Sequence, residues 1–136
     1  MIVGFTATRN ELNKAQIDWI YDELALIARS YRDELEFHHG DCIGGDVKGH
    51  EIAKQLGYKT FAHPSTIPYL RAHCNADVVY PPVAPLQRDK IIVVVSNRLL
   101  AVPGYPESRR SGTWATVRFA RKSNVPISLC ELWDAS

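Results

Sequence analysis

Two short stretches, far apart in the sequence, combine glycine, hydroxyl and arginine residues in a pattern that suits an anionic ligand. The first is "GFTATR", where an apolar run ends in Gly4, Thr6, Thr8 and Arg9. Glycine lets the backbone approach a ligand closely, and a following helix directs free N–H groups toward negative charge. Arginine can form a forked pair with phosphate or carboxylate. The alternative is an ordinary turn between a strand and a helix.

The second stretch, "RRSGTWAT", places two arginines before the start of a predicted helix. Its candidate ligand-binding residues are Arg109, Arg110, Ser111, Gly112 and Thr113. Backbone N–H groups and two hydroxyls at a helix N-terminus form a typical phosphate site. The alternative is a helix capped by Ser111 with a solvated arginine pair.

A third polar cluster, "HHGDCIGGD", occupies residues 38–46. Asp41 or His39 can form a polar wall for a ribose or a base. The cluster could also bind a metal or move protons, but its spacing matches no standard zinc signature. We expect Asp46 to cap the next helix and Gly44 to form the turn into it.

Two further arginines are candidate ligand-binding residues. Arg71 lies in a long loop that could act as a lid. Arg88 and Lys90 lie near the start of a predicted helix. His73 and Cys74 in that loop could ligate a metal with His63, but no fourth ligand is evident. The alternatives are a structured surface loop and a solvated helix start.

Length and composition indicate one soluble globular domain over residues 1–136. The chain is 46% hydrophobic and 23% charged, with a formal net charge of +1. This balance argues against a general binder of polyanions. Three cysteines, widely spaced, favour reduced thiols over a disulfide framework. No leader peptide is evident and "IIVVV" is too short to span a bilayer, so we expect a cytoplasmic protein.

The hydrophobic pattern predicts strands that alternate with helices. Strands are expected over 2–6, 35–40, 58–63, 98–104 and 125–132, and helices over 10–31, 44–57, 84–97 and 111–124. The first helix can be capped by Asn10 or Asn13. Residues 64–84 are expected to be irregular, and Trp114 to lie in the core rather than in an interface. The fold class is therefore α/β: three layers, Rossmann-like, with a mostly parallel five-stranded sheet and helices on both faces.

Ligands of such sheets bind at the carboxyl ends of the strands, where the strand order reverses. If the first and fourth predicted strands are central neighbours, the two glycine-hydroxyl turns meet there. We therefore expect them to form two walls of one crevice.

These residues resemble the SLOG superfamily of Rossmann-like nucleotide-binding domains, which includes the lonely-guy phosphoribohydrolases. The resemblance covers nearly the whole chain and rests on "GFTATR", "HHGDCIGGDVKGHEIA", "RDKIIVVVSNRLLAVPG" and "SGTWATVRFARK". The lonely-guy signature is Pro-Gly-Gly-x-Gly-Thr-x-x-Glu, preceded by an arginine and lysine pair. Pro103 and Gly104 match its start, whereas the insertion "YPESRRS" separates them from the matching Gly112 and Thr113.

The signature glutamate, which is thought to help break an N-glycosidic bond, falls on Thr116. Threonine cannot serve as that carboxylate, and Glu107 or Asp41 are the candidates to replace it. The closer match is the branch of small bacterial and phage domains with a Gly-Asp-Cys-x-Gly-x-Asp pattern. For that branch the resemblance implies nucleotide binding more firmly than any reaction.

We therefore expect a protein that binds a nucleotide or nucleotide-derived molecule of the ADP-ribose or NAD type, including a cyclic nucleotide immune signal. It would act as a sensor or an anti-defence sponge without turnover, with no catalytic residue, cofactor or metal. One alternative is an N-glycosidase or phosphoribohydrolase acting on a nucleoside 5′-monophosphate. Another, single-stranded nucleic-acid binding, is disfavoured by the near-neutral charge. The resemblance also implies a homodimer or larger homo-oligomer and gives no reason to expect a membrane partner.

Overall fold

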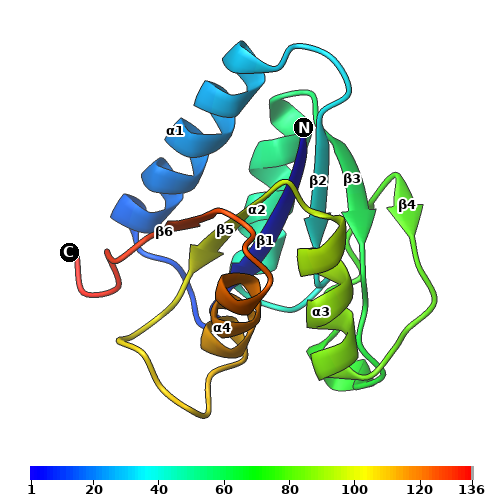
Figure 1. The fold of residues 1–136 in the computed structure, drawn as a ribbon, viewed down its shortest axis with the longest axis vertical. Helices are drawn as coiled ribbons and strands as arrows, with labels where there is room; N and C mark the ends of the chain where they lie inside the picture. The colour runs from blue at the N-terminus through cyan, green and yellow to red at the C-terminus, as the bar shows by residue number, and fades with distance from the viewer. Residues whose placement is uncertain (136) are drawn as a thin grey trace.

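A computed structural model describes residues 1–135, which form an α/β structure with a central sheet (Figure 1). The strands are β1 (Ile2–Ala7), β2 (Glu36–His39), β3 (Lys59–Ala62), β4 (Val78–Val79), β5 (Arg98–Val102) and β6 (Ile127–Leu129). The helices are α1 (Lys14–Ser30), α2 (Gly45–Gln55), α3 (Pro85–Val95) and α4 (Gly112–Lys122), with a 3₁₀ turn at Pro68–Leu70.

All strand pairs are parallel and the sheet has six strands in the order β4-β3-β2-β1-β5-β6. The order reverses between β1 and β5, so the two strands whose adjacency the predicted crevice requires are central neighbours. The predicted strand count of five is wrong because β4 was missed. This strand lies inside the segment expected to be irregular, and two residues are too few to produce an alternating pattern.

The helix starts show one confirmed cap and one incorrect prediction. The Asn13 side chain accepts a hydrogen bond from the Gln16 N–H, and the Gln16 side chain accepts one from the Asn13 N–H, which forms a capping box. At α2 the cap position is Gly44, not Asp46. Gly44 has a φ of +93°, a conformation that glycine adopts readily, so the helix begins before Asp46.

Two helices cover each face of the sheet (Figure 1), which gives the three-layer, Rossmann-like architecture. On one face α1 and α2 pack through residues such as Leu24 and Ile52 onto Phe5 and Phe37. On the other face Val117 and Trp114 of α4 pack onto Ala101, and Trp114 is buried there as expected. The alternation of side chains along the strands places the two cores on opposite sides.

The β-branched run in α3 is helical, as predicted, but only part of its apolar surface is covered. Ile92 and Val93 are buried, whereas Leu86 and Val94 are 65% and 71% exposed. None of the helices described in residues 1–135 is long and apolar enough to cross a membrane.

Gly49 allows α2 to approach the sheet closely. A Cβ at this position would lie 2.7 Å from Cε2 of Phe5 and 3.1 Å from Cζ of Phe37. Both rings are fully buried, so they cannot move aside without disturbing the core.

We predict that Gly49→Ala lowers the free energy of unfolding by about 1–2 kcal/mol, because overpacking outweighs the gain in helix propensity. Urea denaturation measures this change. Gln55→Ala, at an exposed position of the same helix, is the control and should change stability by less than about 0.5 kcal/mol. An unchanged or increased stability of Gly49→Ala would contradict the packing account.

Candidate functional site

A cavity of about 420 Å³ opens at the carboxyl ends of β1 and β5. This volume is typical of sites for small molecules. Its lining comes from the loop after β1, the loop after β2, the segment between β3 and α3, the start of α3 and the loop from β5 into α4. The predicted site residues in this lining are Thr6, Thr8, Arg9, Asp41, Arg71, Arg88, Gly104, Arg110, Ser111, Gly112 and Thr113.

Two predicted site residues are not part of this lining. Gly4 lies in the middle of β1, and a side chain there would collide with Oγ of Ser96 just after α3. The lack of a side chain at Gly4 therefore allows the C-terminal end of α3 to pack closely against β1. Arg109 is exposed and lies outside the cavity, although the adjacent Arg110 is in the lining.

The first predicted turn contacts the end of β5 and the chain just after it. The Thr8 N–H donates to the Val102 carbonyl at 2.9 Å, which extends the β1–β5 pairing into the turn. A Cβ on Gly104 would lie only 2.7 Å from Oγ1 of Thr8, so a residue without a side chain is needed there. Residues of both predicted turns line the same cavity, as the sequence led us to expect.

The second turn presents the N-terminus of α4 to the cavity. Oγ of Ser111 accepts a hydrogen bond from the Trp114 N–H at 3.3 Å, so Ser111 is the helix cap. The next amides, of Gly112 and Thr113, belong to the first turn and have no acceptor within the helix. A Cβ on Gly112 would meet no atom within 4 Å, so the space beside Gly112 is open.

The cations of the cavity fall into two groups. Arg88 is 12% exposed in its side chain, donates to the Gly40 and His63 carbonyls, and pairs with Asp89 at 2.6 Å. It therefore joins three segments of the wall. Arg9 and Arg110 are exposed, and within residues 1–135 no carboxylate pairs with either of them. Both guanidinium groups are thus available to an anion.

Asp41 is committed to contacts within the protein. One carboxylate oxygen accepts from Nε of Arg71 at 3.1 Å and the other from the Cys74 N–H at 2.8 Å. These contacts hold the segment after the 3₁₀ turn against the loop after β2. Asp41 and Arg71 thus shape the wall, and the carboxylate has less capacity for a ribose than we expected.

Two carboxyl groups in the lining were not singled out from the sequence as ligands. Asp46 projects from the first turn of α2, and Asp89 from the second turn of α3. Burial raises the pKa of Asp89, and the Arg88 guanidinium opposes this shift. The sequence pattern did not indicate a ligand role for either residue, because an acidic residue in a first helical turn, such as Asp46, usually serves the helix itself, and a single acid within a helix, such as Asp89, is common.

Asp46 is the more unusual of the two carboxyl groups. One oxygen accepts from the Gly40 and Cys42 N–H groups at 3.1 and 3.2 Å, whereas the other is buried without a hydrogen-bond partner among the described residues. Burial raises its pKa to about 7, although Arg88 and the two backbone hydrogen bonds favour the charged form. The cavity therefore contains an acid that can change its charge near neutral pH.

The acid expected to replace the signature glutamate is not at Glu107. Glu107 pairs with Arg118 and Arg121 of α4 at 3.2 and 3.5 Å and does not line the cavity. Thr116 does line it, and its hydroxyl donates to the Gly112 carbonyl at 2.9 Å.

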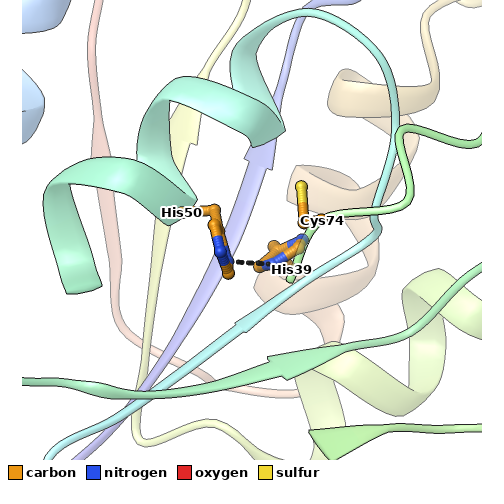
Figure 2. Close-up of side chains that lie close together, drawn as sticks. All are labelled: His39, His50 and Cys74. Atoms are coloured by element: carbon orange, nitrogen blue, oxygen red, sulfur yellow. Dashed lines mark hydrogen bonds between the residues drawn. The ribbon is translucent and has the colours of Figure 1, made fainter. Parts of the chain in front are cut away.

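A separate cluster joins His39, His50 and Cys74 (Figure 2), whose potential ligand atoms lie within 4.8 Å of one another. Nδ1 of His39 accepts from the Asp41 N–H at 2.9 Å, which leaves the proton on Nε2. That Nε2–H points to Nδ1 of His50 at 3.1 Å. A metal at this Nε2 would have to displace the proton.

His39 and Cys74 are both uncharged near neutral pH, and a hydrogen bond joins His39 to His50. Burial, with a contribution from His50, lowers the pKa of His39 to about 3, and burial and Asp41 raise the pKa of Cys74 to about 12. The metal set considered from sequence differs, because His63 instead lies 2.8 Å from His38.

Comparison with known proteins gives structural neighbours but no sequence family. No protein-family model matches the chain, and a search of curated proteins finds no match. Among solved structures, the molybdenum cofactor binding protein from the phototrophic bacterium Rippkaea orientalis is 19% identical, with a TM-score of 0.71 over 94% of this chain and 74% of that one. The molybdenum cofactor carrier protein from Chlamydomonas reinhardtii is 24% identical in one structure and 23% in another. The TM-scores are 0.67 and 0.68, and both matches cover 94% of this chain and 74% of that one. At these identities the likeness establishes a shared fold.

We predict that Asp46→Asn becomes more stable relative to the unchanged protein as pH rises from 4 to 7. The folded-state pKa of Asp46 is raised from 3.8 to about 7, so its protonated form contributes stability that is lost over this window. The difference in unfolding free energy between variant and unchanged protein should grow by about 3 kcal/mol. Urea denaturation at several pH values measures this difference.

Asp22→Asn, at an exposed position of α1, is the control for that comparison. The buried histidines titrate in all three proteins and cancel in the differences. An Asp46→Asn difference that stays constant with pH would show that Asp46 ionises normally in the folded protein.

Proposed function

We propose that this protein binds a nucleotide or nucleotide-derived small molecule in the cavity at the carboxyl ends of β1 and β5. The observation that carries this proposal is that two turns with anion-binding chemistry, distant in sequence, line the same cavity. The cavity also lies where the strand order reverses, which is the usual ligand position in parallel α/β sheets.

The phosphate would lie at the N-terminus of α4, against the amides of Gly112 and Thr113. Arg9 and Arg110 would supply the positive charge, since both are exposed and line the cavity. Charge-assisted hydrogen bonds of this kind are stronger than neutral ones and position an anion well. Arg88 would act mainly by fixing the wall through its bonds to Gly40 and His63.

The fold neighbours support binding of a small molecule, because their names describe a cofactor binding protein and a cofactor carrier. We propose that this chain likewise holds its ligand without turnover, as a sensor or a sponge, and that it belongs to the SLOG superfamily. Within that class we favour ligands of the ADP-ribose or NAD type, including cyclic nucleotide signals. The molybdenum cofactor itself belongs among the ligands to be tested.

Assembly into a homodimer or larger homo-oligomer is part of this proposal. The support is the exposed apolar surface of α3, which includes Leu86 and Val94. Exposed apolar surface of this kind is typical of contacts between proteins.

A second candidate function is hydrolysis of the N-glycosidic bond of a nucleoside 5′-monophosphate. The observation that favours it is the presence of Asp46 and Asp89 in the cavity lining, because a carboxyl with a raised pKa can protonate a leaving base. These acids would have to replace the glutamate that Thr116 lacks.

The experiment is a calorimetric titration with AMP, ADP-ribose, NAD, cyclic ADP-ribose isomers, cyclic dinucleotides and the molybdenum cofactor. Each mixture is then separated by chromatography. Binding with the ligand recovered intact supports the binder, whereas release of free base supports the glycosidase. An absence of binding to every ligand of the panel would contradict the proposal.

We predict that Arg110→Ala weakens binding of AMP about ten-fold or more, because it removes a charge-assisted hydrogen bond to phosphate. Arg109→Ala is the matched control, since Arg109 is the adjacent exposed arginine but lies outside the cavity. The dissociation constant of the Arg109→Ala variant for AMP should stay within about two-fold of the value for the unchanged protein. Equal losses in the two variants would indicate a diffuse electrostatic effect instead of a defined phosphate contact.

A further inference from the structure

The loop from β5 into α4 carries an aromatic side chain at the cavity that neither turn explains. We propose that the ring of Tyr105 is the platform on which a planar ring of the ligand stacks. This inference rests on the proposed function and specifies its ligand class: a phosphate ester that carries a flat heterocycle.

The first argument is that the backbone of this loop is held in place. The indole of Trp114 is buried in the core, and its Nε1–H donates to the Tyr105 carbonyl at 2.9 Å. Further along the loop, Nη1 of Arg118 donates to the Ser108 carbonyl at 3.3 Å and pairs with Glu107. The loop is therefore fixed to α4 at both its start and its middle.

The second argument is that the Tyr105 ring itself is free. Tyr105 is 42% exposed and lines the cavity, and within residues 1–135 no hydrogen bond involves its hydroxyl. No hydrogen bond of the side chain therefore explains its position, and a large part of it is open to solvent. An aromatic ring with a fixed backbone and a free face can stack on a planar ligand with little loss of conformational freedom.

The third argument is the division of the cavity lining by chemistry. The α4 N-terminus and the exposed arginines form a polar part, whereas Ile67, Leu70 and Leu86, from the segment after β3 and the first turn of α3, contribute apolar surface. A ligand that matches both parts has an anionic end and a flat apolar end. A sugar phosphate without a base would leave the apolar part and the Tyr105 ring unused.

The test compares AMP with ribose 5-phosphate, which has the same sugar and phosphate but no ring system. For Tyr105→Ala we expect AMP to bind about ten-fold or more weakly, whereas the affinity for ribose 5-phosphate changes by less than about two-fold. Tyr105→Phe should retain the affinity for AMP, because the face of the ring and not its hydroxyl makes the contact. Isothermal titration calorimetry measures all of these affinities.

Tyr69→Ala is the matched control, since Tyr69 is 80% exposed and lies outside the cavity lining. It should leave both affinities unchanged. The inference is overturned if Tyr105→Ala weakens both ligands equally, which would mean a damaged phosphate site, or weakens neither. If the unchanged protein binds ribose 5-phosphate as tightly as AMP, the phosphate site stands and the stacking platform does not. If it binds neither ligand, the proposed function fails and the inference fails with it.

Discussion

The backbone of Thr8 joins the carboxyl ends of β1 and β5 to the start of α2. Its N–H donates to Val102 at the end of β5, and its carbonyl accepts from the Gly45 N–H at the start of α2, both at 2.9 Å. Gly104 packs directly against its side chain. This one residue therefore fixes the distance between the loops after β1 and β5 and the start of α2. The cavity walls are held in place by these backbone hydrogen bonds together with the side-chain contacts of Arg88 and of the Asp41–Arg71 pair.

Glycines make these close contacts possible. Gly44 provides the positive φ that starts α2 next to the backbone of Arg9, and Gly104 lets the chain after β5 approach Thr8 closely. The chemistry of the cavity then follows from the ends of elements. The N-terminus of α4 offers amides, Arg9 and Arg110 offer positive charge, and Asp46 and Asp89 offer carboxyl groups. Anion binding and acid chemistry are both possible in this space, and the proposed function gives the first of them priority.

Much of the fold could be predicted because helices and strands leave periodic patterns. The alternation of elements follows from the sequence and from the rules for parallel sheets. The neighbouring positions of β1 and β5 were a condition of the predicted crevice, and the sheet order meets it. The two-residue strand β4 left no such pattern. The start of α2 was misplaced because Asp46 resembles a cap, whereas the conformation of Gly44 decides the boundary.

The candidate site was predictable where a turn combines several suitable residue types, as at Arg9 and at Gly112–Thr113. It was not predictable where a function depends on tertiary contacts. The commitment of Asp41 to Arg71, the pairing of Glu107 with Arg118, and the burial of Asp46 all depend on partners distant in sequence or on surroundings that only the folded chain supplies.

The central claim is that one anion-binding cavity lies between the two turns, and the most direct test is a two-dimensional ¹H–¹⁵N NMR titration with AMP. The account predicts saturable shifts that are largest at the amides of Arg9, Gly112 and Thr113. Shifts confined to the groove between α1 and α2, which includes Tyr21 and Lys48, would contradict it, as would an unchanged spectrum.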